Sequence, residues 1–132
     1  MTVVFADTNI AIYAFDQDTA KAQKAEAIMD GAPVISTQVV IEFLNICRVK
    51  LGFDLETRHR LALELMRGCP VITVDCDVIA DAMRVEARYG LSWWDSLIVA
   101  AALLAGCGVL YSEDMQDGLV IDGRLTIVNP LK

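Results

Sequence analysis

The stretch Val3-Val4-Phe5-Ala6-Asp7-Thr8-Asn9 decides the fold class of this chain. Four apolar residues in succession are typical of a strand inside a parallel sheet, where both faces are buried. Asp7 follows directly, at the C-terminal end of the predicted strand. Ligands of open parallel sheets bind at this end of the strands. The segment therefore predicts an α/β protein with a carboxylate at its ligand-binding edge.

The rest of the sequence alternates helical and strand patterns. Helices are expected at residues 9–15, 19–29, 37–51, 54–67, 75–89 and 92–105, and further strands at residues 33–36, 70–74, 109–111 and 125–128. Asp54, Asp75 and Ser92 are expected to cap the helices that they begin. Strands separated by helices form a parallel sheet covered on both faces. With 132 residues, the chain is expected to form a single domain over residues 1–132.

Composition excludes several classes of protein. A hydrophobic content of 55% excludes a disordered chain. The longest uncharged stretch, residues 96–112, is shorter than the ~18 residues that a membrane helix requires, and two glycines interrupt it. The N-terminus lacks the basic region of a signal peptide. We therefore expect a cytoplasmic protein with no membrane partner.

Cysteine and histidine do not indicate a metal or catalytic site. Cys47, Cys69, Cys76 and Cys107 have no zinc-ligand spacing, and we expect them to be reduced and structural. The single histidine, His59, lies in a polar helical segment. A site built on several histidines is therefore excluded, and a Ser–His–Asp triad is not favoured.

Four carboxylates, by contrast, lie in or beside apolar segments: Asp7, Glu42, Asp95 and Asp114. A buried carboxylate is unfavourable unless a cation or hydrogen bonds compensate it. Several together raise one another's pKa values unless a divalent metal takes up the charge. Asp7 and Asp114 follow predicted strands, Glu42 borders the apolar stripe of its helix, and Asp95 lies in a first helical turn. We predict that the four converge into one acidic, metal-dependent site.

Each acid also has a purely structural explanation. Asp7 can cap a helix, Asp95 can complement a helix dipole, Asp114 can belong to a polar loop, and Glu42 can pair with an amide. Four independent coincidences are less probable than one shared site, so the site is favoured. The tandem Trp93 and Trp94 begin an apolar helix, where we expect core packing rather than stacking on a nucleic-acid base.

Four segments together resemble the PIN-domain ribonucleases, most of all the VapC-type toxins of bacterial toxin–antitoxin pairs. They are Phe5-Ala6-Asp7-Thr8-Asn9-Ile10, residues 37–43, residues 92–100 and residues 112–118. The resemblance covers essentially the whole chain, in order. It implies a three-layer α/β/α sandwich with a mostly parallel sheet of about five strands. It also implies a Mg²⁺ or Mn²⁺ site and endonucleolytic cleavage of RNA.

The resemblance also assigns residues. Asp7, Glu42, Asp95 and Asp114 match the acidic quartet of the family. Asn9 and Ser112 match polar residues that steady the carboxylates, and Asp117 is a further acid at a position where related toxins often carry another residue type. Asp7, Asp95 and Asp114 would hold metal directly or through water. Glu42 would ligate it or orient the attacking water, which the metal activates.

Net charge opposes this reading. A charge of −7 disfavours non-specific nucleic-acid binding. Five basic residues concentrate in one stretch of the chain: Arg48, Lys50, Arg58, Arg60 and Arg67. They either contact the backbone of an RNA substrate or form an ordinary solvated surface. The resemblance further implies a homodimer and a cognate antitoxin that inserts a segment into the site.

Two other functions compete with the nuclease. A phosphoacceptor signalling domain would use Asp75 after the third strand, but it requires adjacent acids after the first strand, where Thr8 and Asn9 stand. A non-catalytic PIN scaffold would bind RNA or protein; such a domain is expected to have lost acids that this chain retains.

Overall fold

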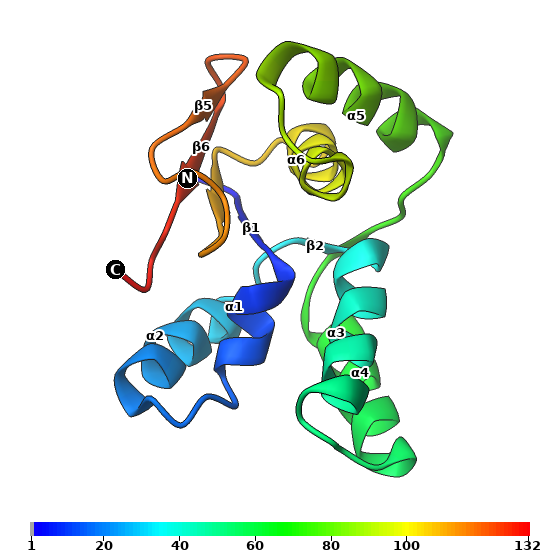
Figure 1. Cartoon of the computed structure of the whole chain (residues 1–132), viewed down its shortest axis with the longest axis vertical. Helices are drawn as coiled ribbons and strands as arrows, with labels where there is room; N and C mark the ends of the chain where they lie inside the picture. Colours follow the sequence, from blue (N-terminus) through cyan, green and yellow to red (C-terminus); the bar gives the residue numbers. More distant parts are fainter. Residues whose placement is uncertain (1) are drawn as a thin grey trace.

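The computed structural model describes residues 2–132, which form a mostly parallel sheet flanked by helices (Figure 1). The main sheet has the strand order β1-β4-β6-β5. Its strands are β1 (Val4–Ala6), β4 (Val109–Tyr111), β5 (Val120–Ile121) and β6 (Leu125–Val128). The strands β1, β4 and β6 are parallel, whereas β5 pairs antiparallel with β6.

A second sheet extends the first beyond β1. It consists of β2 (Ile35–Ser36) and β3 (Val71–Ile72), which pair in parallel. A single parallel bridge between Phe5 and Val34 joins this pair to β1. The chain thus moves from β1 to one side through β2 and β3, then returns to the other side of β1 at β4. Such a reversal of strand order is where open α/β sheets bind ligands.

Within residues 2–132, six helices connect the strands, and the first and second of them, the third and fourth, and the fifth and sixth lie side by side (Figure 1). They are α1 (Thr8–Tyr13), α2 (Thr19–Asp30), α3 (Thr37–Val49), α4 (Leu55–Gly68), α5 (Cys76–Tyr89) and α6 (Trp93–Leu104). The predicted caps are confirmed. Asp54 accepts a hydrogen bond from the Thr57 N–H, Asp75 from the Val78 N–H, and the Ser92 hydroxyl from the Asp95 N–H.

The core includes most of α6 and the centres of the strands. Every residue of α6 from Ser96 to Leu103 is buried, as expected for a helix that is apolar on all sides. Phe5, Leu110 and Ile127, at the centres of three adjacent strands, have no exposed surface. This rigid centre fixes the first turn of α6 relative to the C-terminal ends of β1 and β4.

The predicted α/β architecture with a mostly parallel sheet is confirmed, with one addition. The antiparallel strand β5 was not predicted, because two residues are too few to show a periodic pattern and Val120 is exposed. The main sheet therefore has four strands, and two of the five predicted strands form the separate β2–β3 pair. Among residues 2–132, no helix combines the length and apolar character needed to cross a membrane.

Candidate active site

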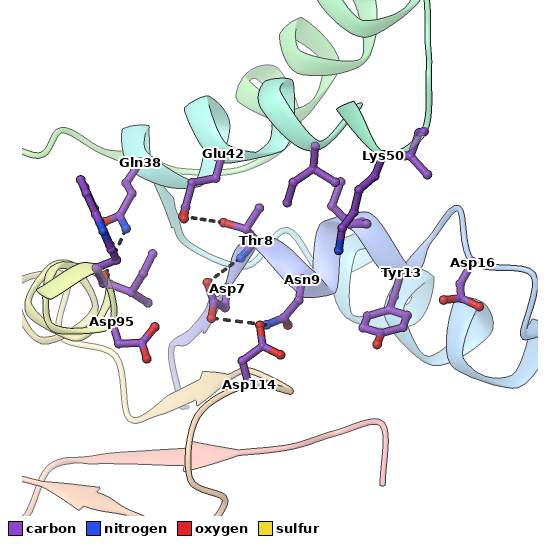
Figure 2. A pocket seen from close by; sticks show the side chains of 15 residues that line it. Asp7, Thr8, Asn9, Tyr13, Asp16, Gln38, Glu42, Lys50, Asp95 and Asp114 are labelled. Atoms are coloured by element: carbon purple, nitrogen blue, oxygen red, sulfur yellow. Dashed lines mark hydrogen bonds between the residues drawn. The ribbon is translucent and has the colours of Figure 1, made fainter. Parts of the chain in front are cut away.

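A pocket of about 410 Å³ opens at the C-terminal ends of β1 and β4. It is lined by residues from α1, α3, α6 and the loop after β4 (Figure 2). All four predicted acids are among them: Asp7, Glu42, Asp95 and Asp114. Figure 2 shows that they come from four separate segments around one space. The structure thus brings together the residues on which the metal-site hypothesis depends.

Asp7 is the most buried of these acids, with 7% of its surface exposed. Its backbone N–H donates to the Tyr111 carbonyl at 3.0 Å, which joins the end of β1 to the end of β4. One carboxylate oxygen accepts from the Thr8 N–H at 2.7 Å, so Asp7 also caps α1. Burial raises the pKa of Asp7 to about 6, and the Ser112 hydrogen bond opposes that rise. Asp7 therefore caps α1, as its structural explanation predicts, and it also lines the pocket.

Asn9 and Ser112 connect Asp7 to Asp114. The buried Ser112 hydroxyl donates to Asp7 Oδ2 at 2.8 Å. Asn9 Nδ2 lies 3.2 Å from Asp114 Oδ2 and 3.4 Å from Ser112 Oγ, and its Oδ1 accepts from the Glu113 N–H. These contacts hold the loop after β4 against the start of α1. They fit the steadying function that the resemblance implies for both residues.

Glu42 and Asp95 face the pocket from two helices, α3 and α6 (Figure 2). Both side chains are partly buried, and burial is the main reason that their pKa values are raised. The negative charge of Asp95 adds to the rise for Glu42, and that of Asp114 adds to the rise for Asp95. Thr8 Oγ1 donates to Glu42 Oε1 at 3.0 Å and partly compensates. The acids therefore interact through their charges across the pocket.

This donor set fits a hard divalent cation. Carboxylate oxygens are the preferred ligands of Mg²⁺, which is commonly held by one or two carboxylates and keeps several waters. None of the four acids takes part in an ion pair formed within residues 2–132. In the same residues no three His, Cys, Asp or Glu side chains form a ready-made ligand cluster. A Mg²⁺ ion at these carboxylates would keep several of its waters.

Other predicted residues lie elsewhere. Asp117 accepts from the Asn129 N–H at 2.8 Å and pairs with Lys132 at 3.0 Å, so the structure does not join it to the four acids. These partners lower the pKa of Asp117. Asp75 does not line the pocket but caps α5, which removes the position required by the phosphoacceptor alternative. His59 is exposed on α4, as predicted.

Of the five basic residues in the stretch from Arg48 to Arg67, only Lys50 lines the pocket. It is the only Lys, Arg or His in the described lining, alongside the carboxylates of five acids. The fifth acid, Asp16, is exposed. Arg60 instead pairs with Glu64 on α4, as expected for a solvated helical surface.

The sequence did not reveal several residues of the site. Thr8 binds Glu42, and Gln38 Nε2 donates to the Trp94 carbonyl at 3.1 Å, which ties α3 to α6. Core packing is confirmed for Trp93 but wrong for Trp94, which is 64% exposed and lines the pocket. The position of Thr8, directly after an acid that ends a strand, is the one signal that could have marked it.

Comparisons with known proteins agree with this geometry. The model of the PIN domain family matches residues 4–116. A search of curated proteins returned no significant match. Among solved structures, a toxin–antitoxin complex from Klebsiella pneumoniae is similar over 98% of this chain and 98% of the other, with 26% identity and a TM-score of 0.71.

Two further structures share the fold at lower identity. The DNA-bound VapBC complex from Salmonella typhimurium aligns over 96% of this chain and 98% of its own, with 17% identity and a TM-score of 0.69. VapC20 from Mycobacterium tuberculosis, a sarcin–ricin loop cleaving toxin, aligns over 84% and 89%, with 19% identity and a TM-score of 0.64. The family model spans most of the sequence, from β1 to the loop after β4, and includes all four acids. The chain belongs to the PIN domain family.

Proposed function

We propose that this protein is a divalent-metal-dependent endoribonuclease that hydrolyses RNA phosphodiester bonds and acts as the toxin of a toxin–antitoxin pair. The observation that carries the proposal is the convergence of Asp7, Glu42, Asp95 and Asp114 on one pocket that contains a single lysine and no other basic residue in its described lining. Membership of the PIN domain family and the similarity to toxins, one of which cleaves the sarcin–ricin loop, support it.

The residues of the chain have distinct functions in this proposal. Asp7, Asp95 and Asp114 would hold Mg²⁺ or Mn²⁺, directly or through water. When bound, the cation neutralises charge at the phosphodiester and lowers the pKa of a water molecule. Glu42 would ligate the ion or orient the attacking water, and the Thr8 hydroxyl holds Glu42 in place. Asn9 and Ser112 keep Asp7 and Asp114 at a fixed separation.

Raised pKa values are consistent with this use of the acids. Carboxylates that protonate readily without a cation gain most from binding one, because the ion replaces the proton. The pKa values of Asp7, Glu42 and Asp95 are all raised by burial. A scaffold without metal chemistry would have no use for three partly or fully buried acids in one pocket.

The partners are also part of the proposal. The Klebsiella pneumoniae structure is a toxin–antitoxin complex, which supports a cognate antitoxin for this chain. We further propose a homodimer that acts in the cytoplasm. Sedimentation of the purified protein would test the dimer, and co-purification with the product of an adjacent reading frame would test the antitoxin.

A cleavage assay tests the nuclease. Purified protein is incubated with labelled bacterial RNA in Mg²⁺, in Mn²⁺ and in EDTA, and the wild type is compared with Asp7→Asn and Asp95→Asn. We expect cutting that requires metal and that falls at least 100-fold in both variants. Asp30→Asn, which removes an exposed carboxylate at the end of α2 outside the pocket, is the matched control and should cut normally.

Three results would contradict the proposal in different ways. Cutting that persists in EDTA would exclude metal dependence. Cutting that survives both variants would indicate a contaminating nuclease. RNA binding without cutting in either metal would favour the non-catalytic scaffold.

A further inference from the structure

The exposed indole of Trp94 has no function in the reaction described above, yet it lines the same pocket as the acids. Its neighbour Trp93 is partly buried and packs against the core, so the two consecutive rings have opposite environments. Single exposed apolar side chains are ordinary on a protein surface. The position of Trp94 is not ordinary, because it immediately precedes Asp95 in the first turn of α6.

The backbone beneath Trp94 is held firmly. Its carbonyl accepts a hydrogen bond from Gln38 Nε2 at 3.1 Å, and Gln38 is itself only 9% exposed. The residues of α6 that follow, from Ser96 to Leu103, are buried. The ring therefore stands on a rigid base while its own surface remains open. A Trp side chain has only two rotatable bonds, so little conformational entropy is lost when it contacts a ligand.

The pocket lining contains an aromatic ring and a cation as well as the acids. Trp94 lies at the start of α6, and Lys50 is the C-cap residue of α3, the helix that also carries Glu42. When the phosphodiester of a substrate lies at the carboxylates, the base attached to it must lie on an adjoining surface of the pocket. An aromatic face accepts any unpaired base by stacking, whereas paired bases are already stacked on one another.

From these observations we infer that Trp94 stacks on the base next to the scissile phosphate and so positions the substrate. This inference rests on the proposed nuclease function and adds a positioning residue to it. Trp94 acts on the base alone, so it places the phosphate without taking part in bond cleavage.

Steady-state cleavage of a random-sequence single-stranded RNA provides the first test. We expect Trp94→Ala to raise KM about 5- to 150-fold, the range that corresponds to loss of one base–aromatic stack, with a smaller change in kcat. Trp94→Phe should restore most of the loss, because a phenyl ring also stacks. Leu104→Ala is the matched control: Leu104 is 54% exposed at the opposite end of α6 and lies outside the pocket.

Binding measured in the Asp7→Asn background provides a readout that a purely structural effect would not change. The probes are a fluorescent single-stranded RNA and an abasic oligomer of equal length. We expect Asp7→Asn protein to prefer the RNA, and Asp7→Asn/Trp94→Ala to lose most of that preference while it binds the abasic oligomer as before. Binding of RNA to the Asp7→Asn protein should quench its tryptophan fluorescence, and this quenching should largely disappear in Asp7→Asn/Trp94→Phe.

The outcomes separate this inference from the nuclease proposal. Metal-dependent cutting with an unchanged KM and unchanged base preference in Trp94→Ala would overturn the stacking function and leave the nuclease intact. A change in sedimentation without a change in RNA binding would assign Trp94 to a protein interface instead. Absence of all cutting by wild type would remove the nuclease and this inference together.

Discussion

The Ser112 hydroxyl donates a hydrogen bond to Asp7 Oδ2 at 2.8 Å, although 105 positions separate the two residues in the sequence. Ser112 is completely buried, so no water replaces this donor. We predict that Ser112→Ala lowers the free energy of unfolding by about 1 kcal/mol and metal affinity or cleavage by roughly 10- to 100-fold. Calorimetric titration with Mn²⁺ and the cleavage assay measure the two effects.

A second variant distinguishes loss of this bond from general destabilisation. Val85→Ala truncates a completely buried residue of α5 outside the pocket, so it should lower stability at least as much and leave metal affinity unchanged. Equal metal affinity in Ser112→Ala and the wild type would contradict the steadying function of the hydroxyl.

Burial of Asp7 predicts an unusual dependence of metal-free stability on pH. Its pKa is about 6 in the folded protein against 3.8 for the ordinary side chain. Because the pKa is higher in the folded protein, protonation of Asp7 contributes to the free energy of unfolding. This contribution is complete below about pH 4 and is lost as pH rises through 6. A rise of about two units corresponds to roughly 3 kcal/mol. Chemical unfolding in EDTA between pH 4 and 8 should therefore show stability falling as pH rises.

The variant Asp7→Asn should remove most of that loss. We expect it to be more stable than the wild type by about 1 to 3 kcal/mol at pH 8 in EDTA, and the difference to shrink or reverse when Mg²⁺ is added, because only the carboxylate gains from the ion. Asp30→Asn, at an exposed end of α2, should follow the wild-type pH curve. Parallel curves for wild type and Asp7→Asn would show that burial of this carboxylate is not destabilising.

The parts of the site that the sequence revealed are those with a local signal. Asp7 directly follows a continuous apolar run, and Ser92 precedes an apolar helix, so their places in the fold follow from neighbouring residues. Trp93 and Trp94 share the same neighbourhood, and only the packing of α6 decides which ring is buried. The contact of Thr8 with Glu42 joins residues 34 positions apart and depends on the angle between α1 and α3.

Asp117 is a candidate that the structure places outside the described pocket lining. It stands in the same short polar loop as Asp114, and the resemblance alone made it a candidate. Its carboxylate oxygens accept hydrogen bonds from Asn129 and Lys132. These two residues follow β6, and the fold brings them beside the loop that contains Asp117. No sequence pattern within the loop indicates those partners, so only the structure shows that Asp117 does not line the pocket.

Lys50 offers a test of how an acidic protein binds a polyanion. It is exposed, lines the pocket, and is the only basic residue in that described lining. If it contacts an RNA phosphate, Lys50→Ala should weaken binding of all sequences similarly and reduce the slope of log K against log salt by about 0.7. Lys24→Ala removes an exposed lysine of α2 outside the pocket and should leave the slope unchanged. An equal change in both variants would indicate an effect of net charge only.

The Thr8 hydroxyl should control the protonation of Glu42. It donates to Glu42 Oε1 at 3.0 Å and lowers a pKa that burial has raised. Thr8→Val keeps the shape of this buried side chain and removes the donor, so the pKa of Glu42 should rise further. An NMR titration of the metal-free protein with labelled glutamate measures this directly. Thr126→Val, on β6 outside the pocket, is the matched control. If the Glu42 titration is the same in Thr8→Val and the wild type, the hydroxyl does not stabilise the ionised carboxylate, and Glu42 would be held by the packing of α3 alone.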